Sequence, residues 1–341
     1  MSQAFLTGAT GFLGQRVARQ LVERGWRVHA LARKGSDKSD LSDLPIVWHA
    51  GDLTDDASLR QAVSSARNFA EDDSLDIVHL AALISYRSGD ADLAREVNVE
   101  GTRRVLSAAL AFNVRRVLHA SSIVTVGFAE GDSVSTEDQA FNGAQLGVDY
   151  VDTKRAAEEQ VMSAASAMDC VVVNPGAIFG PAAEASNSAY FLRRAAAGGV
   201  RVAPPGGVSV VGVDDTAEGV VLALTRGRRG RRYLLCESNY RLHDLLKLVA
   251  QRAGSSSPRL TVPSAVWSAL GKSAGLVDRA KPLTRLTPQA MRMIGVHWRA
   301  DAARAREELG WAPTPFPAVL DSALREMGLI TAPSNTAAST T

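Results

Sequence analysis

The stretch AFLTGATGFLGQRVARQL (residues 4–21) decides the fold of this chain. It opens with a short apolar run and continues into a segment whose apolar residues recur at helical spacing. Between the two parts, Gly8, Gly11 and Gly14 form a G-x-x-G-x-x-G pattern. The first two glycines allow a tight turn and a close approach to a pyrophosphate, and the third allows close packing of helix on strand. The pattern therefore predicts a strand, turn and helix that present a positive helix end to phosphates.

Outward from this unit, short apolar runs alternate with helical stretches up to about residue 175, which is typical of a parallel sheet. After Pro175 the helices shorten and Pro and Gly clusters such as 203–207 appear. We predict an α/β chain with a doubly wound parallel sheet in residues 1–175 and a smaller C-terminal α/β substrate-binding domain in residues 176–330. A strand at 208–215 could rejoin the edge of the main sheet, so that about 208–230 would belong to the first domain. The strands predicted for the first domain are 4–7, 27–31, 46–49, 76–80, 115–120 and 170–174; a further strand is predicted at 232–236.

Composition excludes several classes of protein. The chain has 341 residues, 46% of them hydrophobic, and a formal net charge of +2. These values are typical of a globular protein of about two domains. The chain lacks the excess of cationic residues that is typical of nucleic-acid-binding proteins. Cys170 and Cys236 lie in apolar runs and predict buried free thiols, with no spacing for a metal site.

The N-terminal sequence and the lengths of the apolar runs predict where in the cell the protein is located. No apolar run approaches the roughly 20 residues of a membrane span, and the apolar pattern begins too early for a signal peptide. We expect a cytoplasmic protein without a transmembrane segment. The small polar tail, residues 331–341, is predicted to be disordered.

The end of the second strand bears on the choice of dinucleotide. Ala32, Arg33 and Lys34 stand where an NAD-binding chain places an acidic residue, and no carboxylate follows before Asp37. A guanidinium binds a 2′-phosphate with two hydrogen bonds, so NADP(H) is favoured over NAD(H). A solvated basic pair on a loop is the alternative. After the third strand, Asp52 and Leu53 are placed to read an adenine edge.

Candidate catalytic residues follow the fifth strand. Tyr150 and Lys154 lie four residues apart in a stretch of helical period, which places both on one face of a helix, where an ammonium can lower the pKa of a phenol. Ser121 and Ser122 stand at the carboxyl end of a strand, the edge where open α/β sheets bind ligands. A surface pair for the first two and ordinary turn chemistry for the serines are the alternatives.

These motifs together resemble the extended short-chain dehydrogenase/reductase superfamily of NAD(P)-dependent epimerases, dehydratases and reductases. The resemblance implies a Rossmann sheet, Tyr150 as the acid/base, Lys154 as the residue that lowers its pKa and binds the nicotinamide ribose, and Ser122 as the group that polarises the carbonyl. Asn98 matches a position that organises local backbone and water, with helix packing as the alternative. The motifs are TGATGFLG (7–14), GDLTD (51–55), HLAA (79–82), NVEGT (98–102), SSIVTVG (121–127), YVDTK (150–154) and NPGAIFGP (174–181).

Two features narrow the expected reaction. The run VVVNPGAIFGP (171–181) is similar to that of dihydroflavonol reductases, 3β-hydroxysteroid dehydrogenases and bacterial aldehyde or ketone reductases. Ile123 and Val124 stand where sugar dehydratases carry an acidic residue, which disfavours dehydration. We therefore expect an NADPH-dependent reductase of an aldehyde or ketone. The alternatives are a 3β-hydroxysteroid or 3-oxoacyl-lipid dehydrogenase, a nucleotide-sugar epimerase, and a non-catalytic NADP(H) sensor.

The remaining expectations concern binding residues and partners. The substrate is expected to be a small apolar carbonyl or alcohol compound, and a homodimer is expected by family likeness. The apolar stretch 262–277 is interpreted as ordinary packing, with a pocket lid or a membrane-surface helix as alternatives. The predicted substrate-binding residues are Ile84, Ser85, Phe128, Tyr190 and Phe191. The predicted cofactor-binding residues are Gly8, Thr10, Gly11, Phe12, Leu13, Gly14, Arg33, Lys34, Asp52, Leu53, Ala81, Ala82, Tyr150, Lys154, Pro175, Ala177 and Ile178.

Overall fold

A computed structural model of the chain describes residues 1–69, 75–181, 187–280 and 286–331. Within them, seven parallel strands form the main sheet in the order β10-β6-β5-β4-β1-β2-β3. The order reverses between β1 and β4, which creates a crevice at the carboxyl ends of these strands. The predicted doubly wound parallel sheet is thereby confirmed. Its strands are β1 (Gln3–Thr7), β2 (Arg27–Ala32), β3 (Val47–Ala50), β4 (Leu75–His79), β5 (Arg116–Ala120), β6 (Asp169–Pro175) and β10 (Arg232–Leu235).

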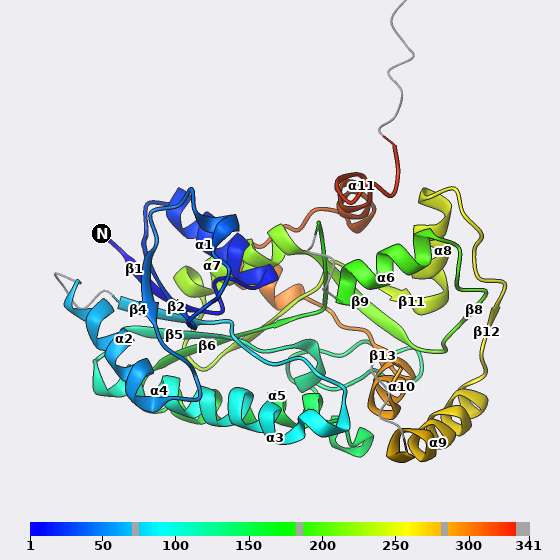
Figure 1. Cartoon of the computed structure of the whole chain (residues 1–341), viewed down its shortest axis with the longest axis horizontal. Helices are drawn as coiled ribbons and strands as arrows, with labels where there is room; N and C mark the ends of the chain where they lie inside the picture. Colours follow the sequence, from blue (N-terminus) through cyan, green and yellow to red (C-terminus); the bar gives the residue numbers. More distant parts are fainter. Residues whose placement is uncertain (70–74, 182–186, 281–285, 332–341) are drawn as a thin grey trace, which may run out of the picture.

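Helices cover both faces of the sheet (Figure 1). Successive side chains of a strand point to opposite faces, so each strand contributes to two cores. Leu6 and Val78 cluster with Val17 on one face, whereas Phe5 and Ile77 cluster on the other. The first face is covered by α1 (Phe12–Glu23) and α7 (Val213–Arg226), and the second by α2 (Asp56–Asn68), α4 (Gly101–Ala111) and α5 (Asp149–Ala164).

Short helical turns shape the loops at the carboxyl edge of the sheet. The helix α3 (Ala91–Ala94) runs through a π-helical turn, Arg95–Glu100, directly into α4. A single 3₁₀ turn, Ile123–Thr125, follows β5. Further single turns are Ser39–Leu41, Ser88–Asp90 and Gly143–Leu146.

The C-terminal part is built around β9 (Gly207–Gly212), which pairs antiparallel with β11 (Ser238–Arg241) and parallel with β7 (Ala177–Phe179) and β13 (His297–Trp298). Phe179, Leu192 and Phe316 belong to its apolar core. A small parallel pair, β8 (Val202–Ala203) and β12 (Leu260–Thr261), lies at its rim. Its helices are α6 (Asn187–Ala196), α8 (Leu242–Arg252), α9 (Ser264–Ala280), α10 (Pro288–Ile294) and α11 (Phe316–Glu326), and a π-helical turn spans Ala305–Leu309.

The prediction that the strand at 208–215 rejoins the main sheet was wrong. That strand is β9, which lies at the centre of the second sheet, and α7 begins at Val213. The chain returns to the main sheet one element later, because α7 packs on α1 and β10 then pairs with β6. Both runs are apolar and rich in β-branched or aromatic residues, so the sequence pattern alone does not say which of them reaches the edge.

Three further predictions concern the cysteines, the C-terminal tail and membrane-spanning segments. Cys170 and Cys236 are both buried, as predicted. The predicted disordered tail lies, from residue 332 onward, outside the described residues. None of the helices within the described ranges combines the length and the apolar character needed to span a membrane.

Candidate active site

The glycine turn after β1 has a backbone that only glycine tolerates. Gly8 has φ +77°, and a Cβ there would lie 2.7 Å from the backbone nitrogen of Ala81. The N–H of Gly11 donates to the carbonyl oxygen of Gly8 at 3.0 Å, and a Cβ on Gly14 would lie 1.9 Å from that same oxygen. The helix α1 then begins at Phe12 without a side-chain cap. Its first N–H groups therefore fit the pyrophosphate of a dinucleotide.

A surface pocket of about 600 Å³ lies at the carboxyl ends of β2 and β3. Arg33 and Lys34 line it together with Asp52 and Asp55. Both carboxylates are engaged locally, since Asp55 caps α2 and Asp52 accepts from the N–H and hydroxyl of Thr54. The pocket also contains Gly35, Ser36, Ala50, Gly51 and Ser58. Two exposed cations beside two engaged carboxylates fit a 2′-phosphate on the adenosine ribose.

Leu53 is placed differently from its neighbour Asp52. Its side chain is 6% exposed and belongs to the core under α2 and α4. Its carbonyl oxygen accepts a hydrogen bond from Arg104 at 3.1 Å. The side chain therefore packs the fold and does not face the pocket.

A polar chain connects β1 to the loop after β4. The hydroxyl of Thr7 lies 2.7 Å from Nδ1 of His79 and accepts from the N–H of Ala81 at 3.2 Å. Farther along this loop, the N–H of Leu83 donates to Oδ1 of Asn98 at 2.7 Å, and Nδ2 of Asn98 donates to the carbonyl of Leu83 at 3.0 Å. Asn98 thus holds the backbone next to Ala81 and Ala82, the predicted cofactor-binding residues.

Tyr150 and Lys154 lie one turn apart on α5, both buried, at 7% and 2% exposure. Nζ of Lys154 donates to the carbonyl oxygen of Ala120 at 2.8 Å. Burial lowers the pKa of Lys154 to about 8, and the negative charge of Glu158 opposes this shift. Burial raises the pKa of Tyr150 above the ordinary value of a phenol, and a hydrogen bond with Ser122 opposes that shift. That Lys154 lowers the pKa of the phenol stays a prediction, which rests on the ammonium lying one helical turn away.

Ser122 stands at the end of β5 with Tyr150 as its partner. Its hydroxyl oxygen also accepts a long bond, 3.4 Å, from the N–H of Val124 and so caps the turn Ile123–Thr125. Ser121 is buried, with its hydroxyl 3.2 Å from that of Thr125. Of the two serines, the partly exposed Ser122 is therefore the one available to a ligand.

Tyr86, which the sequence places beside Ile84 and Ser85 after the fourth strand, packs its ring edge-on against Tyr150 with centroids 5.7 Å apart. Burial and the neighbouring phenol raise the pKa of Tyr86 far above its ordinary value. Its carbonyl oxygen accepts a hydrogen bond from the hydroxyl of Thr287 at 2.6 Å. The sequence gives its position in the loop after β4, whereas the contact with Thr287, 201 positions away, is visible only in the structure.

The predicted substrate-binding residues occupy different environments. Ile84 and Tyr190 are 53% and 45% exposed. Phe128 packs edge-on against Trp298, with centroids 5.9 Å apart. Phe191 packs against the core residue Phe179, and the hydroxyl of Ser85 donates to Asp90 at 2.6 Å. Phe191 and Ser85 thus have structural contacts of their own.

The predicted cofactor-binding residues after β6 lie at the junction between the two sheets. Pro175 is the last residue of β6, and Ala177 and Ile178 belong to β7, which pairs with β9. Between them, the N–H of Gly176 donates to the carbonyl oxygen of Leu235 at 3.0 Å. This junction borders the carboxyl edge of the main sheet, where the glycine turn also lies.

A glycine turn on a doubly wound sheet, with serine, tyrosine and lysine at its carboxyl edge, defines a nucleotide-binding enzyme. The chain belongs to the NAD dependent epimerase/dehydratase family, whose model matches residues 4–236. It is similar to "Sterol demethylase protein B" of Methylococcus capsulatus, with 32% identity over 95% of this chain and 99% of that protein. It is also similar to a putative dihydroflavonol 4-reductase of Synechocystis, with 30% identity over 90% of this chain and 89% of that one.

Among solved structures, the one titled "Crystal structure of gox2253" covers 97% of this chain and 100% of its own, with a TM-score of 0.83 and 28% identity. The resemblance to extended short-chain dehydrogenases/reductases is therefore confirmed. The NAD-dependent family and the relative named as a reductase indicate an oxidoreductase or epimerase.

Proposed function

We propose that this protein is an NADP(H)-dependent oxidoreductase that reduces an aldehyde or ketone to the alcohol. The observation that carries the proposal is the buried phenol of Tyr150, hydrogen-bonded to Ser122 and one helical turn from the ammonium of Lys154. A reduced nicotinamide, when bound, supplies the hydride. Tyr150 donates a proton to the carbonyl oxygen, Ser122 donates a hydrogen bond to the same oxygen, and Lys154 orients the nicotinamide ribose.

The pKa values of the site suit the reducing direction. Burial raises the pKa of Tyr150 above that of an ordinary phenol, so its hydroxyl is protonated at neutral pH and ready to donate. Lys154, with a pKa of about 8, still carries most of its charge at neutral pH. A positive charge near the phenol favours the phenolate that remains after the proton has left.

Arg33 and Lys34 support NADPH as the coenzyme, since their pocket fits a 2′-phosphate. Gly8, Gly11 and Gly14 would hold the pyrophosphate at the N-terminus of α1. The expected cytoplasmic location, the homodimer and the division at residue 175 into cofactor and substrate domains belong to the same proposal.

The substrate is proposed to be an apolar carbonyl compound. Aliphatic and aromatic residues, Ile84, Phe128 and Tyr190, follow the strand ends or open the C-terminal part. A second candidate, a 3β-hydroxysteroid or 3-oxoacyl-lipid dehydrogenase of the same mechanism, is favoured by the relative named for sterol demethylation, which is 32% identical.

The test is a panel of aldehydes, ketones, 3-oxosteroids and 3-oxoacyl lipids, with loss of the absorbance of reduced nicotinamide as the readout. The substitution Tyr150→Phe is expected to lower kcat by about 100- to 10,000-fold while the Kd for NADPH stays within about threefold. Tyr240→Phe is the matched control, because Tyr240 packs against Phe316 in the C-terminal core. Full turnover by Tyr150→Phe, or NADPH oxidation with no compound of the panel, would overturn the proposal.

A further inference from the structure

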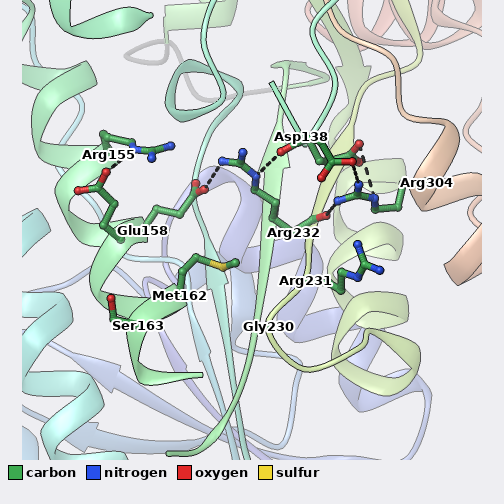
Figure 2. Close-up of a pocket in the computed structure, with 11 residues that line it drawn as sticks. Asp138, Arg155, Glu158, Met162, Ser163, Gly230, Arg231, Arg232 and Arg304 are labelled. Carbon is green, nitrogen blue, oxygen red and sulfur yellow. Dashed lines mark hydrogen bonds and ion pairs between the residues drawn. The ribbon is translucent and has the colours of Figure 1, made fainter. Parts of the chain in front are cut away.

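Glu158 lies one helical turn beyond Lys154 on α5 and is 1% exposed. Its Oε2 accepts from the hydroxyl of Thr125 at 2.5 Å and from Nδ2 of Asn174 at 2.7 Å. Its Oε1 accepts from Nη1 of Arg232 at 3.0 Å, and Figure 2 shows these two side chains facing each other. A carboxylate buried this deeply is costly unless it is fully paired, and here three donors reach it.

The two donors on Oε2 lead back to Ser122. The carbonyl oxygen of Ser122 lies 2.7 Å from the hydroxyl of Thr125 and accepts from Nδ2 of Asn174 at 3.2 Å. The N–H of Thr125 donates to this carbonyl as well, at 3.1 Å. The hydroxyl of Thr125 has a single hydrogen for Glu158 and Ser122, so the turn and the carboxylate share it.

This network joins the three elements that carry the candidate site. Glu158 comes from α5, which also carries Tyr150 and Lys154, and Thr125 ends the turn that follows β5. Asn174 lies at the end of β6, directly before Pro175. The carboxylate is therefore the point at which the helix with the phenol and the turn with the serine are fixed relative to each other.

We propose that Glu158 is a positioning residue, whose carboxylate, held by Arg232, sets the position of Ser122 relative to Tyr150 and Lys154. The inference rests on the proposed function, because Ser122, Tyr150 and Lys154 are its reacting set. Arg232 and Glu158 line a surface pocket of about 730 Å³, and Arg155 lies on the same pocket wall (Figure 2). Glu159 also lines this pocket. A substitution of Arg232 therefore acts on this network through its ion pair with Glu158.

The charge of Glu158 also acts on Lys154. Two buried histidines, His79 on β4 and His119 on β5, interact electrostatically with the ammonium of Lys154. Burial and, to a lesser extent, the charge of Lys154 hold the pKa of both histidines well below the ordinary value, so both are neutral. Tyr150 is neutral as well, and Arg232 is the cation beyond Glu158. Among these groups Glu158 supplies the negative charge, which raises the pKa of Lys154.

The test compares Glu158→Gln with Glu159→Gln, which removes the next carboxylate of the same helix. Glu159 is exposed and pairs with Arg155, so it serves as the matched control. Glu158→Gln is expected to lower kcat by about 10- to 100-fold, since small displacements of catalytic groups have effects of this size. It should also move the alkaline limbs of kcat and of the Kd for NADPH to lower pH, because the pKa of Lys154 falls without the neighbouring charge.

A second pair of variants separates positioning from general damage. Arg232→Met removes the cation that pairs with Glu158, so that the carboxylate acts more strongly on Lys154, and is expected to move the same alkaline limbs to higher pH, opposite to Glu158→Gln. Thr125→Val is expected to lower kcat as Glu158→Gln does, whereas Thr125→Ser, which keeps the hydroxyl, should retain most turnover. If Glu158→Gln fails to fold, the Thr125 and Arg232 variants decide.

The inference is overturned if kcat is unchanged in Glu158→Gln, or if Glu158→Gln and Glu159→Gln lose kcat equally. It is also overturned if the alkaline limbs of the pH profiles shift in the same direction in Glu158→Gln and Arg232→Met. Equal turnover by Thr125→Val and Thr125→Ser would do the same. A wild-type chain that binds NADPH but reduces no compound would overturn the proposed function alone. The pH dependence of the Kd for NADPH would then still test the position and charge of Glu158.

Discussion

Replacing Lys154 by methionine separates the contribution of the buried ammonium to function from its effect on the fold. Burial lowers the pKa of Lys154 from 10.5 to about 8. Between these values the unfolded chain binds more protons than the folded one, so stability rises with pH in this window. Below pH 8 the folded state bears the full penalty, about 3 kcal/mol at 1.36 kcal/mol per pKa unit. Methionine is an unbranched side chain only one heavy atom shorter, and it carries no such penalty.

The hydrogen bond from Nζ of Lys154 to the carbonyl oxygen of Ala120, 2.8 Å, works in the opposite direction. Its loss leaves a buried carbonyl without this donor, which costs about 1–3 kcal/mol. This loss does not depend strongly on pH, whereas the ionisation penalty shrinks as the solution becomes alkaline. The difference in unfolding free energy, variant minus wild type, should therefore fall by about 2 kcal/mol between pH 7 and pH 10.

The assay is urea denaturation of both chains at pH 7 and pH 10, without added nucleotide. Lys247→Met on α8 is the control, because Lys247 is exposed and its substitution should give the same difference at both pH values. NADPH binding and turnover should be lost in Lys154→Met at either pH. A stability difference that stays constant from pH 7 to pH 10, or grows, would refute the reasoning.

Three further substitutions test other parts of the site. Gly14→Ala would place a methyl carbon 1.9 Å from a backbone oxygen. NADPH titration should therefore show that binding is lost or at least about tenfold weaker. The control Gly89→Ala, whose added methyl group meets no neighbour, should bind NADPH normally. Arg33→Ala should raise the KM for NADPH by about 10-fold or more and leave that for NADH nearly unchanged; equal effects would contradict the 2′-phosphate assignment. Asn98→Ala leaves the N–H and carbonyl of Leu83 without their partner and should lower the unfolding free energy by about 1–3 kcal/mol in denaturation experiments; an unchanged midpoint would contradict it.

The sequence predicted those parts of the fold that depend on local pattern. The strand, glycine turn and helix of residues 4–21 carry their own chemistry, because a positive φ and a close backbone approach both require glycine. The spacing of Tyr150 and Lys154 is also a local pattern, because one turn of α5 places residues four positions apart on the same face of the helix. The position of β9 and β10 was not predictable in this way, since it depends on which apolar run the helix α7 carries back to the main sheet.

The parts of the site that were missed depend on contacts between distant segments. Thr125 and Glu158 lie 33 positions apart, and Glu158 and Arg232 lie 74 apart. In the sequence, Glu158 is one of several charged residues after Lys154, and a solvated helix face would carry the same letters. Only the packing of α5 against β6 and the turn Ile123–Thr125, with Arg232 reaching in from β10, makes it a buried carboxylate with three donors.

The C-terminal segment also contributes to the geometry around Tyr150. Oε1 of Gln289, on α10, accepts from the N–H of Asp149 at 2.9 Å, and its Nε2 donates to the carboxylate of Asp149 at 2.5 Å. Two residues earlier, Thr287 holds the carbonyl of Tyr86. The family model matches residues 4–236, so these contacts come from outside the matched region. The first turn of α5 and the ring beside the phenol of Tyr150 are thus held by the part of the chain proposed to bind the substrate. Changes in α10 should therefore alter turnover as well as substrate choice.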